Sequence, residues 1–110
     1  MNKYNAKKTT VDGIVFDSKR ESLRYKELKI LLNAGIIKDL VLQPKFELQP
    51  HYKKNGKTIR AIHYIADFSY YDNEKGHEVI EDSKGFRTAT YLLKKKLFGY
   101  KYPDKTIIEV

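Results

Sequence analysis

The chain has 110 residues and a formal net charge of +8, from 22 Lys and Arg against 14 Asp and Glu, and it contains no cysteine. This length predicts one domain with one modest core, and the absence of cysteine excludes a disulfide scaffold, a thiolate metal site and a cysteine nucleophile. Its apolar runs fall short of the ~20 residues that a membrane span needs, and MNKYNAKKTT lacks the apolar region of a signal peptide, so we expect a soluble cytoplasmic protein.

The N-terminal part predicts an arm and a hairpin. Residues 1–10 are polar and basic, so we expect a flexible arm there, followed by a single domain over residues 11–110. Asp12-Gly13 lies between two short β-branched runs, which is typical of a tight hairpin.

A helix is predicted next, over the sequence DSKRESLRYKELKILLNAG. Ser18 and Glu21 have the spacing of a capping box, and Gly35 suits the position that follows a helix. Glu21 precedes Tyr25 by four residues and Leu28 by seven. It therefore belongs to the stripe that faces the core.

The middle of the chain is rich in strand-forming residues. Pro44 and Pro50 interrupt its first part and suit strand ends or edges. The turns KNGK and DNEKG divide the region into three strand-like segments: IIKDLVLQPKFELQPHYKK, the long TIRAIHYIADFSYY, and HEVIEDSKG.

The C-terminal part predicts a second helix and a last strand. The helix should begin near Arg87 or Thr88, with Ala89, Leu93 and Leu97 on one stripe. We expect a short strand over residues 106–110. The order α-β-β-β-α-β predicts an α/β fold with a mixed sheet between helices.

Charge is distributed unevenly along the chain. Residues 67–82 hold six acids and one base, whereas residues 83–106 hold seven bases and one acid. The excess of bases favours a polyanionic partner, nucleic acid first, and the gathered acids could hold cations within a phosphate-binding surface. For Asp72 and Glu74 we favour a solvated turn instead.

Asp67 and Asp82 stand in strand-like segments where a core face is expected. We expect Asp67 near the middle of one strand and Asp82 on its hairpin neighbour, about 4.8 Å away, so both can point the same way. Such carboxylates are costly to bury unless a cation lies between them, and Mg²⁺ and Mn²⁺ prefer oxygen ligands. Lys84, on the face of Asp82, would position a water or neutralise a phosphate, and Glu21 would enter from the first helix.

Each of these residues also has a purely structural interpretation. Glu21 can serve only the capping box, Asp82 and Lys84 can form an ion pair, and Asp67 can bond to backbone near a bulge. Glu81 competes with Asp82 as a ligand. Regular alternation places Glu81 on the face away from Lys84, and a bulge would reverse that assignment.

The ordered set of Glu21 on a first helix, Asp67 in IADF and the triplet Asp82-Ser83-Lys84 before a basic helix resembles the PD-(D/E)XK nuclease superfamily. The segments DGIVFDSKRE, LQPKFEL, YIADFSY, EDSKG and TATYLLKKKLF further resemble a small family of phage-encoded, Holliday-junction-resolvase-like proteins within it. The resemblance covers the chain from about residue 4 to residue 110 and implies a restriction-endonuclease-like αβββαβ core. The chain departs from the pattern in having Ala66 before Asp67 instead of proline, and Asp82 instead of the commoner glutamate.

The resemblance implies an Mg²⁺- or Mn²⁺-dependent endodeoxyribonuclease that cuts branched DNA in phage recombination or replication, in the cytoplasm of a bacterial host cell. It implies Asp67, Asp82 and Glu21 as metal ligands, with the Ser83 backbone carbonyl, and Lys84 as the catalytic lysine. Because a resolvase cuts two strands symmetrically, we expect a homodimer.

Several further residues are candidate contacts in such a site. For DNA we expect contacts along the second helix. Lys3, Lys7 and Lys8 would add nonspecific affinity. His63 and Gln43 could line the same cleft. The residues expected to contact DNA are Arg87, Thr88, Tyr91, Lys94 and Lys96.

Other functions stay open on the sequence. One is a noncatalytic DNA-binding or replisome-interaction module that kept a nuclease fold, and another is an RNA-binding accessory protein. Within nucleases, a transposase-type or restriction-type enzyme is the nearest alternative, although 110 residues show no target-recognition insertion.

Overall fold

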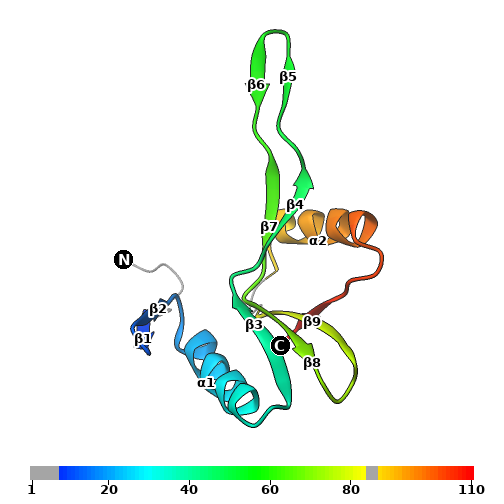
Figure 1. Ribbon diagram of the computed structural model, residues 1–110. Coiled ribbons are helices and arrows are strands. Elements are labelled where there is room, and N and C mark those ends of the chain that lie inside the picture. Colours follow the sequence, from blue (N-terminus) through cyan, green and yellow to red (C-terminus); the bar gives the residue numbers. More distant parts are fainter. Residues whose placement is uncertain (1–7, 84–86) are drawn as a thin grey trace.

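The computed structural model describes residues 8–83 and 87–110 (Figure 1). Neither helix in this part of the chain is long and apolar enough to cross a membrane. The helices are α1 (Lys19–Asn33) and α2 (Ala89–Lys101). The strands are β1 (Thr9–Val11), β2 (Ile14–Phe16), β3 (Ile37–Leu42), β4 (Lys45–Gln49), β5 (Tyr52–Lys54), β6 (Lys57–Ile59), β7 (Ile62–Ile65), β8 (Phe68–Asp72), β9 (His77–Asp82) and β10 (Ile107–Glu109).

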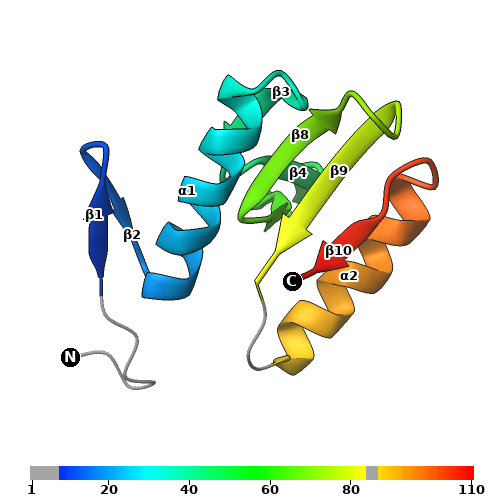
Figure 2. The same cartoon turned by 90° about the horizontal axis from the view of Figure 1, so that it is seen from below.

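A four-stranded mixed sheet in the order β10-β9-β8-β3 forms the centre of the fold (Figure 2). β3, β8 and β9 pair antiparallel, and β10 lies parallel to β9. A parallel pair needs a crossover, and α2 supplies it between β9 and β10. The predicted α/β class is confirmed, and the elements of this core follow one another as α1, β3, β8, β9, α2 and β10.

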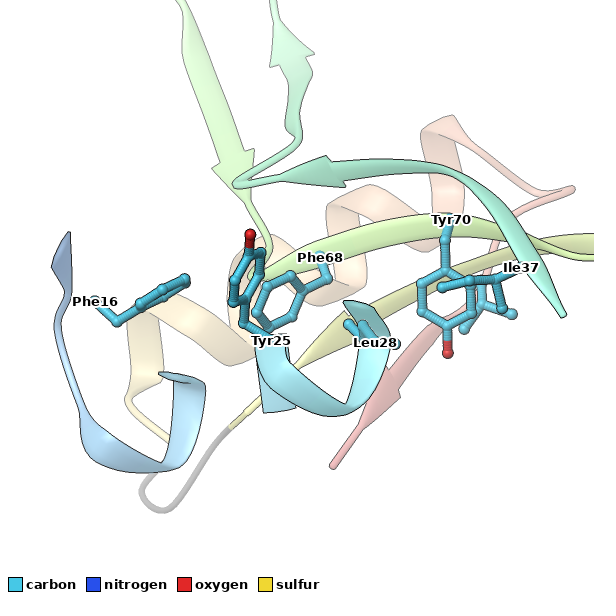
Figure 3. Close-up of a cluster of buried hydrophobic side chains, with 7 residues drawn as sticks. Phe16, Tyr25, Leu28, Ile37, Phe68 and Tyr70 are labelled. Atoms are coloured by element: carbon cyan, nitrogen blue, oxygen red, sulfur yellow. The ribbon is translucent and has the colours of Figure 1, made fainter. Parts of the chain in front are cut away.

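The sheet is buried on both faces by two hydrophobic clusters. Val79 and Ile80 are neighbours on β9 and belong to different clusters, because successive strand residues point to opposite faces. The cluster on the α1 side is drawn in Figure 3 and consists of Phe16, Tyr25, Leu28, Ile37, Phe68, Tyr70 and Val79. The cluster on the α2 side consists of Tyr64, Ala66, Ile80, Tyr91, Phe98 and Ile107.

The predicted N-terminal hairpin is confirmed. β1 and β2 pair antiparallel, and the turn between them places Asp12 at φ 53° and Gly13 at φ 75°, a conformation that favours such residues. Thr9 and Thr10, the last two residues of the predicted arm, lie in β1. Lys3 and Lys7 lie outside the described residues.

The limits of α1 also follow the predicted signals. The Ser18 side chain accepts a hydrogen bond from the Glu21 backbone N–H at 3.1 Å, which satisfies one of the free donors at the helix start. Gly35 follows the helix at φ 75°, where a side chain would be strained. The buried stripe of α1 begins with Glu21 and Ser22 and continues with Tyr25 and Leu28.

The prediction of one long strand over TIRAIHYIADFSYY is wrong. The segment is divided into β6, β7 and β8, and each of these strands pairs with a different partner. Asp67 lies in the break between β7 and β8, not in the middle of a strand. At the break, the Ala66 N–H donates to the Pro44 carbonyl at 3.1 Å and the Asp67 N–H donates to the Glu81 carbonyl at 3.1 Å. At Asp67 the chain thus leaves the β4–β7 ladder and enters the β8–β9 ladder.

The α2 stripe of Ala89, Leu93 and Leu97 is not the buried side of the helix. Leu93 is 57% exposed and Leu97 is 40% exposed, whereas Tyr91 and Phe98 are buried. Phe98 packs edge-on against Phe46 with ring centroids 5.1 Å apart, which ties the helix to β4. Aromatic rings from distant strands decide which side of α2 is buried, and helical periodicity alone does not show it.

A two-stranded ribbon, residues 45–65, leaves the body of the molecule (Figure 1). Its base is the antiparallel pair β4–β7 and its tip is the pair β5–β6. The sequence KNGK forms the turn at the tip as predicted, with Asn55 at φ 52° and Gly56 at φ 74°. The projection of this ribbon away from the sheet is not predicted by the sequence patterns.

Candidate functional site

Asp67 and Asp82 meet at one end of the β8–β9 ladder. Phe68 pairs with Glu81 at the end of the ladder, and Asp67 and Asp82 are the residues that directly adjoin this last pair. Both carboxylates act on the Tyr64 hydroxyl, Asp82 through a hydrogen bond and Asp67 through its charge. The Ser83 N–H donates to the Asp67 Oδ2 at 2.6 Å, which orients that carboxylate toward the end of β9. The fold therefore brings these two predicted site residues together.

Asp82 is fully buried beside a tyrosine. Its side chain is 0% exposed, and the Tyr64 hydroxyl donates to its Oδ2. Burial raises the pKa of Tyr64, and the hydrogen bond to Asp82 together with the charges of Asp82 and Asp67 raises it further. Tyr64 is thus held as a neutral donor to this carboxylate.

Glu81 points to the opposite face and belongs to a separate network. The Arg24 guanidinium donates to both of its oxygens, from Nε to Oε1 at 2.8 Å and from Nη2 to Oε2 at 2.5 Å, and the Tyr70 hydroxyl donates to Oε2. The hydrogen bond to Glu81 is the main reason that the pKa of Arg24 is raised. The β8–β9 register is uninterrupted from Phe68 to Asp72, so Glu81 and Asp82 point to opposite faces, and it is Asp82 that shares the neighbour Tyr64 with Asp67.

Glu21 is buried on the sheet-facing side of α1, at 8% exposure. Within residues 8–83 and 87–110, however, no group of three or more His, Cys, Asp or Glu side chains is arranged to hold a metal. Lys84 lies outside the described residues.

The donor chemistry of the carboxylate pair fits a hard divalent cation. Mg²⁺ is usually held by one or two carboxylates and takes its remaining ligands from water and substrate phosphate. Asp67 is half-buried at the ladder end and Asp82 is buried beside it, so the pair offers hard oxygen donors next to the surface. Two carboxylates so close together gain from a cation between them.

Basic side chains lie on the α1 side of the ladder end. A pocket there is lined by Lys19, Arg20 and Ser83, together with the C-terminal Val110. The Arg20 guanidinium donates to the Val110 carbonyl at 2.7 Å. Sequence reasoning missed these two cations, although they directly precede Glu21 in the chain.

A second pocket lies on the α2 side. His63, Tyr64, Thr88 and Lys94 are among its lining residues. The Thr88 Oγ1 caps α2 by accepting the Tyr91 N–H at 3.0 Å. His63 and Lys94 are thus close to the tyrosine that binds Asp82.

The other predicted DNA contacts differ in their accessibility. Lys96 is exposed, and Arg87, also exposed, forms an ion pair with Glu109. Tyr91 is only 7% exposed and its hydroxyl donates to the Glu109 Oε2 at 2.7 Å, so it is a core residue and not the surface contact that we expected. Gln43 is exposed, and its backbone N–H donates to the Asp67 carbonyl at 2.9 Å.

Alkaline pH should destabilise the fold through buried tyrosines. The folded-state pKa values of Tyr64 and Tyr70 are raised above the usual 10.0, first by burial and then by their hydrogen bonds to Asp82 and Glu81. Their stabilisation is therefore fully present below pH 10 and is lost as the pH rises above it. Above pH 10, each of the two tyrosines should lower the free energy of unfolding by at most about 1.4 kcal/mol per pH unit.

Urea unfolding between about pH 8 and about pH 11 measures this slope. Tyr70→Phe should make the slope shallower, and Tyr100→Phe is the matched control because that ring is 89% exposed. An unchanged slope in Tyr70→Phe would contradict the prediction.

Comparison with known proteins gives one family. The family described as "Protein of unknown function (DUF1064)" matches residues 1–109. No curated protein and no solved structure matches the chain.

Proposed function

Because the chain belongs to the DUF1064 family of proteins of unknown function, we propose its activity from its own residues: it is an Mg²⁺- or Mn²⁺-dependent endodeoxyribonuclease. One observation carries the proposal. Asp67 and Asp82 lie together at one end of the β8–β9 ladder, both near the Tyr64 hydroxyl, in a chain whose net charge is +8. Paired carboxylates in a strongly basic protein are suited to hydrolysis of a polyanion with a bound cation.

The residues that would hold the cation are Asp67 and Asp82, joined by the Ser83 carbonyl and by Glu21 as the resemblance to PD-(D/E)XK nucleases implies. When bound, the cation polarises a phosphate and lowers the pKa of a coordinated water. The Tyr64 hydroxyl and the Ser83 N–H hold the two carboxylates in place.

Lys84 has the role that the resemblance assigns to it. Its ammonium orients the attacking water or stabilises charge on the phosphate. Lys94, in the pocket beside Tyr64, and Lys19 and Arg20, in the pocket beside Ser83, bind the phosphates on either side. The products are a 5′-phosphate and a 3′-hydroxyl, as the resemblance implies.

The proposed substrate is branched DNA, in phage recombination or replication. This assignment rests on the resemblance to Holliday-junction-resolvase-like proteins. Two symmetric cuts across a junction require two active sites, so the proposed active form is a homodimer.

Cleavage of a set of labelled DNAs tests the proposal. The purified protein is incubated with four-way junctions, flaps and linear duplexes in Mg²⁺, in Mn²⁺ and in EDTA. We expect cutting in either metal, strongest on the junctions, and none in EDTA. Intact DNA in both metals would refute the nuclease proposal.

A noncatalytic DNA-binding module on the same fold is the second candidate. It is favoured by the absence, within residues 8–83 and 87–110, of a group of three acidic or histidine side chains arranged for a metal. Salt-dependent DNA binding without cutting in any metal would select it.

A further inference from the structure

The ribbon tip is a strongly cationic surface outside the site described above. Residues 50–60 are all exposed, and no acid occurs between Glu47 and Asp67. The tip carries the cations Lys53, Lys54, Lys57 and Arg60. Within residues 8–83 and 87–110, β5 and β6 pair with each other alone, in a separate two-stranded sheet. It is therefore free to contact another molecule along its length.

The register of the tip places like charges against each other. Lys54 pairs directly with Lys57, and Tyr52 pairs with Ile59 on the same face. Like charges at opposite positions destabilise a strand pair, and no acid of residues 48–66 is available to compensate. A polyanionic partner relieves this repulsion. The exposed Tyr52 ring and the exposed Ile59 side chain lie next to these lysines and can pack on sugars.

The base of the ribbon is fixed to the carboxylate site. β7 runs through Ala66 directly into Asp67, and the backbone of Gln43, just before β4, is hydrogen-bonded to the Asp67 carbonyl. α2 packs on the base through the Phe46–Phe98 and Tyr64–Phe98 ring contacts. The ribbon therefore leaves the site in a defined direction.

The length of the ribbon sets its reach. From Ala66 to Gly56 the chain rises roughly 33 Å, at about 3.3 Å per residue. One turn of B-DNA is about 34 Å. A duplex that has one phosphate at Asp67 and Asp82 can therefore present further phosphates at the tip, about one helical turn away.

We propose that the ribbon lies along the duplex that flanks the cutting site and binds its phosphates through Lys53, Lys54, Lys57 and Arg60. A major groove admits a two-stranded ribbon, so the tip can follow the groove while its lysines reach both phosphate edges. This inference rests on the proposed function for its choice of DNA as the partner. In this arrangement the ribbon binds the duplex beside the cutting site, and the carboxylates at the ladder end take part in the cleavage.

DNA binding measured in EDTA, where no cutting is expected, tests the ribbon separately from the cutting site. Full-length protein is titrated in EDTA, by fluorescence anisotropy over a series of salt concentrations, against hairpin-closed four-way junctions with arms of about 6 or about 20 base pairs. The triple variant Lys53→Gln, Lys54→Gln, Lys57→Gln is compared with Lys26→Gln, Lys29→Gln, Lys75→Gln, which removes equal charge from α1 and the β8–β9 turn.

The ribbon variant should bind the long-arm junction at least roughly tenfold more weakly than the control variant, with a salt slope smaller by about 2.7, or 0.9 for each lost phosphate contact. On the short-arm junction the two variants should bind alike. Equal binding of the two variants to the long-arm junction would overturn the proposal. A ribbon-dependent preference for single-stranded RNA over these junctions would overturn the choice of DNA.

The ribbon proposal and the nuclease proposal would be refuted by different experimental results. If the same preparations bind long arms through the ribbon and leave DNA intact in Mg²⁺ and Mn²⁺, the nuclease proposal fails and the ribbon proposal stands. If they cut DNA and the ribbon variant binds like the control, the ribbon proposal alone fails. Circular dichroism of both variants confirms that each remains folded.

Discussion

Replacing Asp82 with asparagine is expected to lower DNA cleavage in Mg²⁺ roughly a thousandfold, which corresponds to about 4 kcal/mol of lost transition-state stabilisation. Asparagine keeps the size of the side chain and an acceptor for the Tyr64 hydroxyl, but it removes the charge that a divalent cation needs. Asp67→Asn should have an effect of the same order. Single-turnover cleavage of a labelled four-way junction measures the loss.

Asp39→Asn is the matched control for these substitutions. Asp39 is exposed on β3 and has a positive φ of 55°, which asparagine tolerates as well as aspartate, so cleavage should be unchanged. DNA binding in EDTA should be nearly equal in all three variants and wild type. Cleavage by Asp82→Asn and Asp67→Asn at the wild-type rate would remove both carboxylates from the proposed mechanism.

Replacing Arg24 with alanine is expected to lower the free energy of unfolding by about 3–5 kcal/mol. Glu81 is 1% exposed, and Arg24 donates to both of its carboxylate oxygens, so the variant would leave a buried charge that keeps the Tyr70 hydroxyl but loses the guanidinium. Urea unfolding at neutral pH measures the change. Because Glu81 faces away from Asp67, the folded variant should still cut DNA.

Two companion variants separate this network from ordinary surface ion pairs. Glu27→Ala removes the other, 3.6 Å partner of Arg24, whose side chain is 65% exposed, and should cost less than about 1 kcal/mol. Arg24→Met combined with Glu81→Leu removes both charges and should recover much of the stability lost in Arg24→Ala. A loss of under about 1 kcal/mol in Arg24→Ala would show that Glu81 does not depend on this pair.

Local signals in the sequence predicted the elements that depend on a few neighbouring residues. Asp12-Gly13 and Asn55-Gly56 form the expected tight turns, and Ser18 caps α1 as expected. These features form because the side chain and the backbone that it shapes are close in the chain. Alternation along β9 likewise predicted that Glu81 and Asp82 point to opposite faces, which holds for any regular strand.

Features that depend on distant partners were not predictable in this way. β7 pairs with β4 and β8 pairs with β9, so the break at Asp67 is decided by which ladder each half joins. Phe98 of α2 packs against Phe46 and Tyr64 on the ribbon base, and these contacts decide which side of the helix is buried. The leucines of α2 do not decide it. Nothing in the spacing of residues within α2 reports on those rings.

The sequence by itself therefore determined the α/β class, the turns and caps, the opposite faces of Glu81 and Asp82, and the basic character of the chain. The tertiary structure alone decided that the chain breaks between two strands at Asp67, that Arg24 neutralises Glu81 from α1, and that a cationic ribbon leaves the carboxylate site. The physical reason is that turns, caps and alternation are set within a few residues. Strand pairing and helix packing, by contrast, are chosen among distant surfaces by the area that they bury and the charges that they pair.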